Sequence, residues 1–125
     1  MPYTACVLED ISRGILAEFM LRTQQPADHF EVLCHHMTVD MKPIAKSMGA
    51  ELDGQRHELR VVRFGRLEGV MAVEVETLVP SKNARKHVTL CVDKANGWKP
   101  MRSNEITEWT DIEPFTIYGV VKEVS

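Results

Sequence analysis

The sequence predicts a single α+β domain over residues 1–125, with an antiparallel-rich sheet and short helices. Three observations support this fold class. The length suits one domain with a core of its own. The composition, 44% hydrophobic and 26% charged, is ordinary for a globular protein. Runs of strand-forming residues, separated by turn signals, recur along the chain. The expected order of elements is β-α-β-α-β-β-β-α-β.

The first strand and the first helix occupy the N-terminal part of the chain. Residues 3–8 (Tyr-Thr-Ala-Cys-Val-Leu) have the composition of a strand. Asp10 can cap a helix that we expect to end near Thr23, before Gln25 and Pro26. Apolar residues at helical spacing predict the buried stripe of this helix: Ile11, Ile15 and Phe19, with Leu16 and Met20 beside them.

A second strand and a short helix are expected next. Residues 30–39 are apolar at both odd and even positions, which predicts a central strand buried on both faces. Lys42-Pro43 opens a short helix, because proline suits the first helical turn, and Gly49 is expected to close it. The residues of this helix that we expect to face inward are Ile44, Met48 and Leu52.

The rest of the chain predicts mainly strands, at residues 57–64, 70–79, 86–93 and 115–124. The first two are joined through residues 65–69, which begin and end with glycine, and they form a β-hairpin. A loop at residues 97–104 follows the third, and Ser103 or Asn104 can cap a short helix after it. The expected core face of the hairpin's second strand is Met71, Val73, Val75 and Val79.

Two similar motifs, His36-Met37-Thr38-Val39 and His87-Val88-Thr89-Leu90, carry the chemistry of the sequence. Each lies in a predicted strand. Because side chains alternate along a strand, the His and Thr of each motif face the same way. The apolar residues between and after them then face the core. If the two strands are near each other, two imidazoles and two hydroxyls converge on one surface.

This set of groups suits acid–base chemistry on a phosphate. Two histidines flanking a phosphorus atom can remove a proton from the attacking oxygen and give one to the leaving oxygen, because the usual pKa of histidine is near neutral pH. Two threonine hydroxyls can donate hydrogen bonds to the other phosphate oxygens, where charge gathers in the transition state. The chemistry requires no metal or other cofactor.

With these motifs, the sequence resembles the two-histidine (2H) phosphoesterases, which include LigT-like RNA ligases and cyclic phosphodiesterases. The stretch Gly97-Trp98-Lys99-Pro100-x-x-Ser103-Asn104 is similar to the segment after the second motif in the phosphodiesterase domain of fungal tRNA ligases. The resemblance implies a LigT-like cleft and a phosphodiesterase that acts on 2′,3′-cyclic phosphates or related nucleotide phosphodiesters. It implies that His36 and His87 are the acid and the base, in either order, and that Thr38 and Thr89 hold the phosphate.

Four further residues are candidates for contacts with a substrate. Lys99 could contact a phosphate, and Trp98 could stack on a base. Ser103, in the same stretch, and Tyr118, on the last predicted strand, complete the candidate set. His35 is expected on the strand face opposite His36, packed within the fold.

Two other functions compete with the phosphodiesterase. Cys34, His36, His87 and Cys91 fall on the predicted cleft faces, and two Cys with two His form a common zinc set. Metal analysis of the protein would test that alternative. A non-catalytic module that binds a nucleotide or a protein on the same fold is the other, and it would bind without turnover.

Charge and composition limit the partners. The formal net charge is −3, so no strong basic field indicates a DNA duplex, and we expect a small nucleotide or an RNA end as the partner. The three cysteines, Cys6, Cys34 and Cys91, lie in apolar contexts and predict buried free thiols in a reducing compartment. No apolar run is long enough to span a membrane, so we expect no membrane partner and a cytoplasmic location.

Overall fold

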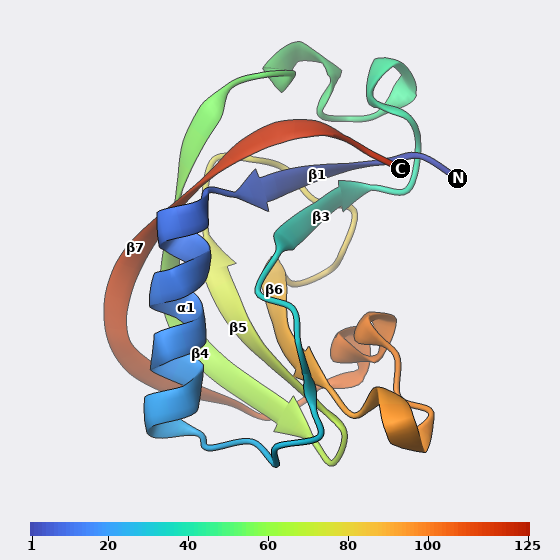
Figure 1. Cartoon of the computed structure of the whole chain (residues 1–125). Helices are drawn as coiled ribbons and strands as arrows, with labels where there is room; N and C mark the ends of the chain where they lie inside the picture. Colours follow the sequence, from blue (N-terminus) through green and yellow to red (C-terminus); the bar gives the residue numbers. More distant parts are fainter.

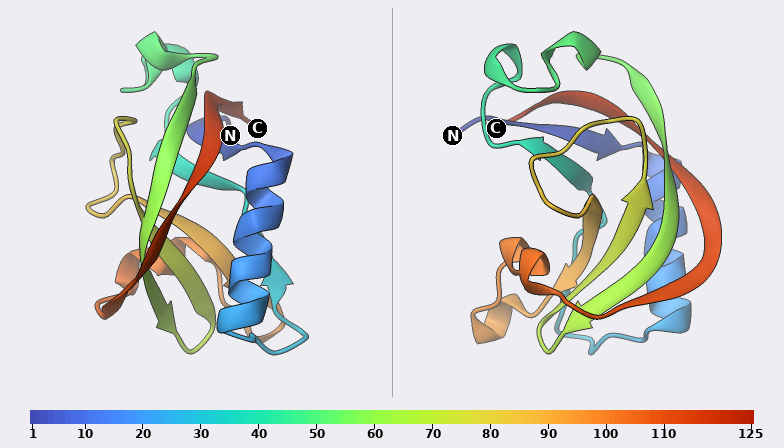
Figure 2. Two further views of the ribbon diagram at one scale, coloured as in Figure 1. Left: turned by 90° about the vertical axis from the view of Figure 1, so that its left-hand side faces the viewer. Right: turned by 180° about the vertical axis from the view of Figure 1, so that it is seen from behind.

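Each strand of the protein pairs with its neighbours in antiparallel orientation, and the pairing closes on itself (Figures 1 and 2). The computed structural model describes all 125 residues, Met1–Ser125. Six strands form the closed barrel, in the order β6-β3-β1-β7-β4-β5 and back to β6. Their bounds are β1 Tyr3–Leu8, β3 His36–Asp40, β4 Arg56–Leu67, β5 Val70–Glu76, β6 His87–Val92 and β7 Trp109–Val124. A short seventh strand, β2 (Glu31–Val32), pairs with the end of β6.

The two longest strands, β4 and β7, curve around the back of the barrel (Figure 2). Their pairing shifts in register between Val61 and Arg63 of β4, opposite the stretch of β7 that contains Pro114. Such a bulge bends a strand and increases its twist, and a sheet must curve in this way to close. Proline lacks the N–H that a regular ladder would use, so its position at the irregularity leaves no ladder bond broken.

The interior of the barrel is the hydrophobic core. Strand residues at alternate positions face inward, among them Met37 and Val39 of β3 and Val88 of β6, each with no exposed surface. The expected inward face of the hairpin is confirmed, because Met71, Val73, Val75 and Val79 all belong to this core. The predicted hairpin of β4 and β5 is confirmed, but the predicted connection over residues 65–69 was too long. Residues 65–67 pair within β4, and the turn consists of Glu68 and Gly69.

The one α-helix, α1 (Asp10–Thr23), lies alongside β7 and has the predicted bounds (Figure 1). Its buried face differs from the prediction: Ser12, Leu16 and Met20 are buried, whereas Ile11 is 80% exposed and Ile15 is 44% exposed. Polar contacts fix the rotation of the helix about its axis and so decide which residues are buried. The spacing of apolar residues in the sequence does not reveal these contacts. The Ser12 hydroxyl accepts a hydrogen bond from the Tyr118 backbone N–H at 2.8 Å. The predicted cap was also wrong, because Glu9 precedes the helix and its side chain makes no capping bond.

The predicted continuous strand over residues 30–39 is interrupted between β2 and β3. Cys34 has a φ of +46°, in the left-handed region, which reverses the alternation of faces. The segment still follows β6, because the backbone N–H groups of Leu33 and Cys34 donate to the carbonyls of Leu90 and Thr89. As a result, the expectation that His35 faces away from His36 was wrong.

Two short helices were predicted, after Lys42-Pro43 and after Ser103 or Asn104, and the structure has four 3₁₀ turns instead: η1 Ile44–Lys46, η2 Ala50–Leu52, η3 Lys94–Asn96 and η4 Pro100–Glu105. The third was not predicted, and the fourth lies in the stretch predicted as a loop. Gly49 does not close the first of them but precedes η2, and Met48 is 42% exposed instead of inward. Pro100 begins η4, so Ser103 and Asn104 lie within it instead of capping it. No helix of the structure has the length and apolar character needed to cross a membrane.

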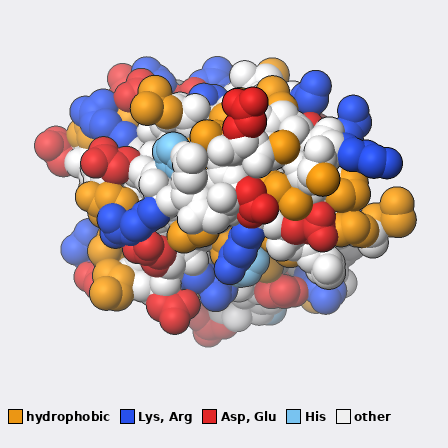
Figure 3. All heavy atoms as spheres, turned by 90° about the horizontal axis from the view of Figure 1, so that it is seen from above, with side chains coloured by type: hydrophobic (Ala, Val, Ile, Leu, Met, Phe, Trp, Pro, Cys, Tyr) orange, Lys and Arg blue, Asp and Glu red, His pale blue; other side chains and the backbone are white.

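Charged side chains of both signs are interspersed on the face shown in Figure 3. Ion pairs join separate segments of the chain, such as Arg56 of β4 with Glu9, the residue before α1, at 2.7 Å, and Arg60 of β4 with Glu76 of β5 at 3.1 Å. Exposed pairs of this kind contribute at most about 1 kcal/mol each. The barrel is therefore stabilised mainly by its ladders and its core.

Candidate functional site

The two His-x-Thr motifs lie on adjacent strands of the barrel. Met37 of β3 pairs with Val88 of β6 in antiparallel register, and both of these side chains face the core. The residues on either side of each point outward. The register places His36 across from Thr89, and Thr38 across from His87. Two imidazoles and two hydroxyls therefore share one patch of the outer surface of the barrel.

This patch is the floor of a pocket of about 660 Å³. Its walls come from β1, from the segment before β3, from the loop between β5 and β6, and from η4. The lining residues are Tyr3, Leu33, His35, His36, Thr38, Met41, Asn83, His87, Thr89, Pro100, Met101 and Asn104. A pocket of this size accommodates a small-molecule ligand.

His87 is held by the backbone at the start of its own strand. Its Nδ1–H donates a hydrogen bond to the carbonyl oxygen of Arg85 at 2.8 Å, since a carbonyl can only accept. The neutral ring therefore carries its lone pair on Nε2. The side chain is 7% exposed, and burial lowers the pKa of His87, an effect that the bond to Arg85 partly opposes. A neutral imidazole with a free Nε2 is the form that a general base needs.

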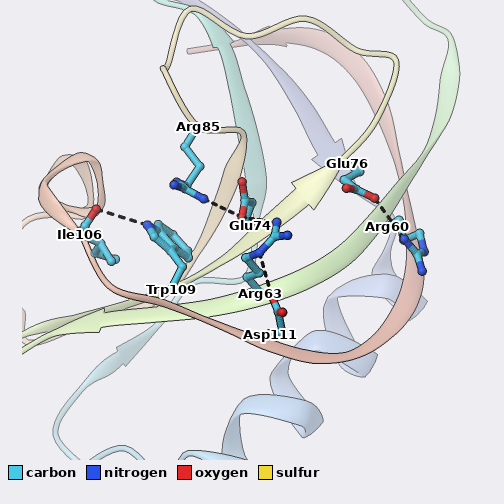
Figure 4. A network of polar contacts seen from close by, with 8 residues as sticks. All are labelled: Arg60, Arg63, Glu74, Glu76, Arg85, Ile106, Trp109 and Asp111. Atoms are coloured by element: carbon cyan, nitrogen blue, oxygen red, sulfur yellow. Dashed lines mark hydrogen bonds and ion pairs between the residues drawn. The ribbon is translucent and has the colours of Figure 1, made fainter.

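Arg85, whose carbonyl accepts the hydrogen bond from His87, is held in place by a network of charged side chains (Figure 4). The Arg85 guanidinium donates to Glu74 of β5 at 2.8 Å and lies 5.1 Å from the ring centre of Trp109. Glu74 also accepts from Arg63 of β4 at 2.9 Å. Three strands thus anchor the chain just before β6, which positions the Arg85 carbonyl against the histidine.

His36 is in contact with two other pocket residues. Its Nε2 lies 3.4 Å from the hydroxyl of Tyr3, and its Nδ1 lies 2.9 Å from Nδ1 of His35. Burial is the main cause that lowers the pKa of His36 to about 4, and the nearby rings of His35 and His87 lower it further. His36 is consequently neutral at pH 7 in the free protein.

The threonines are supported by two serines. The Thr89 hydroxyl shares a hydrogen bond of 2.8 Å with the hydroxyl of Ser103, which is 1% exposed. The Ser81 hydroxyl donates to the backbone carbonyl of Thr38 at 2.7 Å and so ties the loop before β6 to β3. Ser103, a predicted substrate contact, therefore lies beneath Thr89 instead of lining the pocket.

The other three predicted substrate contacts do not line the pocket. Trp98 packs on Gly69, beside the buried residues Val70, Ala72 and Ile106, so it covers an edge of the core. Lys99 is exposed at the start of η4 and does not line the pocket. Tyr118 lies on β7 under the guanidinium of Arg56, 4.1 Å from the ring centre.

Sequence reasoning missed several pocket residues, among them Tyr3, His35 and Asn83. The pairing of β1 with β3 brings Tyr3 to the site, and the loop between β5 and β6 brings Asn83. No local pattern in the sequence marks either residue as part of a site. For His35 the adjacency to His36 was a signal, but the positive φ of Cys34 that turns it into the pocket is not visible in the sequence.

The zinc set of Cys34, His36, His87 and Cys91 is not assembled. Both cysteines lie in the core, and burial raises the pKa of Cys34 to about 12 and that of Cys91 to about 11. Cys91 faces inward because Leu90 is an extra residue in the pairing of β6 with β5. No group of three or more His, Cys, Asp or Glu residues is placed to hold a metal ion. The prediction that all three cysteines are buried and free is confirmed.

The sequence matches no model of a known protein family and no curated protein. The inference about function therefore depends on the residues of the pocket.

Proposed function

We propose that this chain is a single-domain, metal-independent phosphodiesterase of the two-histidine type, acting on 2′,3′-cyclic phosphates or related nucleotide phosphodiesters. The main support is that His36, Thr38, His87 and Thr89, far apart in the sequence, line one pocket on paired strands. The pocket over β3 and β6 would be the counterpart of the LigT-like cleft.

The hydrogen bonds favour particular roles for the two histidines. Because Nδ1 of His87 donates to Arg85, its Nε2 can take a proton from a water molecule that attacks the phosphorus. The bond from phosphorus to the 2′ or the 3′ oxygen then breaks, and His36, as an imidazolium, gives its proton to that oxygen. One water molecule is consumed, and the product is a phosphate monoester. His36 binds its proton when the anionic substrate is present, since a nearby negative charge raises the pKa of an imidazole.

The threonines complete the phosphate site. Thr38 and Thr89 offer hydroxyls to the two non-bridging oxygens, where they stabilise the charge of the transition state. The bond between Thr89 and Ser103 limits the rotation of the Thr89 hydroxyl. Apolar residues around them, including Leu33, Met41 and Met101, supply surface for the sugar or the base.

The charge of the pocket favours a diester. No Lys, Arg, Asp or Glu is among its lining residues, so an anion is bound by hydroxyls, amides and imidazoles alone. A phosphodiester carries one negative charge, and one imidazolium can balance it. A small nucleotide or an RNA end with a cyclic phosphate fits these requirements, and the expected cytoplasmic location stays a prediction.

Turnover of a panel of nucleoside 2′,3′-cyclic phosphates and of an RNA oligonucleotide with a 2′,3′-cyclic end tests the proposal, with a chelator in the buffer. We expect turnover by the wild type and a loss on the order of a hundredfold or more in His36→Ala and His87→Ala. His57→Ala is the matched control, because His57 of β4 does not line the pocket and its ring contacts Gln55.

Turnover that survives both substitutions would refute the mechanism. Binding of the nucleotides without any turnover, unchanged in His36→Ala, would indicate the non-catalytic module instead.

A further inference from the structure

His35 and His36 are adjacent in the chain, and yet their rings meet in the same pocket. The ring centres are 5.1 Å apart, the ring planes are nearly perpendicular at 82°, and the two Nδ1 atoms are separated by 2.9 Å. In a regular strand, neighbouring side chains face opposite ways. The left-handed conformation of Cys34 and the hydrogen bond from the Leu8 N–H to the His35 carbonyl place the His35 ring beside His36.

A separation of 2.9 Å between two ring nitrogens is a hydrogen bond, so one of them carries a proton and the other a lone pair. The two possible arrangements have different consequences. If His35 donates, the neutral His36 ring has its proton on Nε2, and the nitrogen with a lone pair is occupied by His35. If His36 donates, its Nε2 has the lone pair and can gain and lose a proton.

We propose that His35 is a positioning residue for the acid of the proposed phosphodiesterase: its Nδ1 accepts a hydrogen bond from Nδ1–H of His36 and leaves Nε2 of His36 to exchange the proton with the substrate. The inference rests on the proposed function. His36 as an imidazolium has protons on both nitrogens, so the same acceptor also stabilises the charged form. Proton transfer then takes place at Nε2 alone, and the bond to His35 is kept throughout.

The contacts of the pair favour this direction. The Tyr3 hydroxyl lies 3.4 Å from Nε2 of His36 and can donate to a lone pair there, which leaves Nδ1 of His36 to carry the proton. The groups that face His36 are His35, Tyr3 of β1 and His87 of β6, none of which is a permanent cation. Burial lowers the pKa of His35, and Arg13 of α1 and Lys122 of β7, which face it, lower it further, so His35 suits the role of a neutral acceptor.

The tautomers of the histidines in the full-length free protein test the proposal without any assay of activity. Long-range ¹H–¹⁵N NMR at pH 7 distinguishes a protonated ring nitrogen from one with a lone pair. For the wild type we expect His36 to be protonated at Nδ1 and not at Nε2. In His35→Ala we expect a mixture of the two tautomers, and in His35→Asn, whose side-chain oxygen can accept, a return toward the wild-type state. His57→Ala should leave the His36 signals unchanged.

A lone pair on Nδ1 of His36 in the wild type, or identical His36 signals in the wild type and His35→Ala, would overturn the proposal. The wild-type spectrum decides even if a variant fails to fold.

Kinetics with a nucleoside 2′,3′-cyclic phosphate supply the second readout. We expect kcat to fall about tenfold or more in His35→Ala, as part of what acid catalysis contributes, with KM within about twofold and partial rescue in His35→Asn. A loss confined to KM would contradict a positioning role. If the wild type turns over no cyclic phosphate, the proposed function fails, and the tautomer measurement still decides whether His35 holds His36.

Discussion

At the scale of single residues, burial controls the charge of the site. The imidazoles of His36 and His87 lie in a pocket without carboxylates, so nothing there stabilises an imidazolium until an anion arrives. Both histidines have a lowered pKa, and for both of them burial is the largest cause. Both imidazoles are therefore neutral near pH 7 in the free protein, and in the proposed reaction His36 gains its proton when the anionic substrate binds.

The lowered pKa of His36 predicts a pH-dependent stability. The folded protein binds a proton at His36 only near pH 4, whereas an unfolded histidine binds one near its usual value of 6.5. Between these values the unfolded state holds the extra proton, so the free energy of unfolding falls as the pH is lowered from 6.5 toward 4. The loss is at most about 3 kcal/mol. His35 and His87 act in the same direction.

Urea denaturation of the wild type and of His36→Gln at pH 7.5 and pH 5 measures this effect. The variant should lose less stability than the wild type over this interval. Equal losses in the two proteins would show that His36 is not held neutral by the fold.

At the scale of elements, alternation and turn chemistry predicted the strands well, because those signals are local. The bounds of β1 and of α1 and the hairpin of β4 and β5 were all readable from the sequence. The buried face of α1 was not, because it depends on Ser12 meeting the backbone of Tyr118, a residue 106 positions away. The two motifs could be placed on strands, but the tyrosine, the asparagine and the adjacent histidine that surround them could not, since a closed barrel and one positive φ bring them in.

The η4 segment is an element on which the site depends. It supplies pocket residues and holds Ser103 against Thr89, and it is preceded by Trp98. Trp98 lies so close to Gly69 that a Cβ there would be 2.1 Å from the indole. Gly69→Ala must displace the tryptophan, so we expect a destabilisation of about 1–3 kcal/mol and faster hydrogen exchange in η4.

Gly14→Ala is the control for that substitution. A Cβ at Gly14 meets nothing within 4 Å, and alanine is a better helix former, so this change should stabilise the protein by about 0.5–1 kcal/mol. Chemical denaturation and hydrogen exchange of the two variants decide the matter. Unchanged exchange in η4 of Gly69→Ala would contradict the role given to this contact.

At the scale of the whole molecule, the site lies where β3 pairs with β6, and we call this junction the seam of the barrel. β3 and β6 share a single register pair, Met37 with Val88, whereas β4 and β7 pair along most of their length. The two motifs are brought together only when this seam closes. The geometry of the site is thus a property of the closed barrel and not of either strand.

The absence of charged groups from the pocket lining predicts selectivity by ligand charge. A phosphate monoester carries about two negative charges at pH 7.5 and close to one at pH 5, because its second pKa is about 6. Lowering the pH from 7.5 to 5 should therefore strengthen inhibition by a nucleoside monophosphate, the product of the proposed reaction, at least about tenfold more than it strengthens inhibition by a phosphodiester, which carries one charge at both values. Inhibition constants of the two compounds at the two pH values measure this, and an equal gain for both would contradict a pocket built for a diester.

The central claim is that two imidazoles from opposite parts of the chain face one phosphate. The most direct measurement follows the ring ¹⁵N signals of His36 and His87 while a slowly hydrolysed nucleoside 2′,3′-cyclic phosphorothioate is added. We predict that both signals shift along one saturation curve and that the pKa of His36 rises above its value of about 4 in the free protein. A shift at only one of the two histidines, or at neither, would contradict the account.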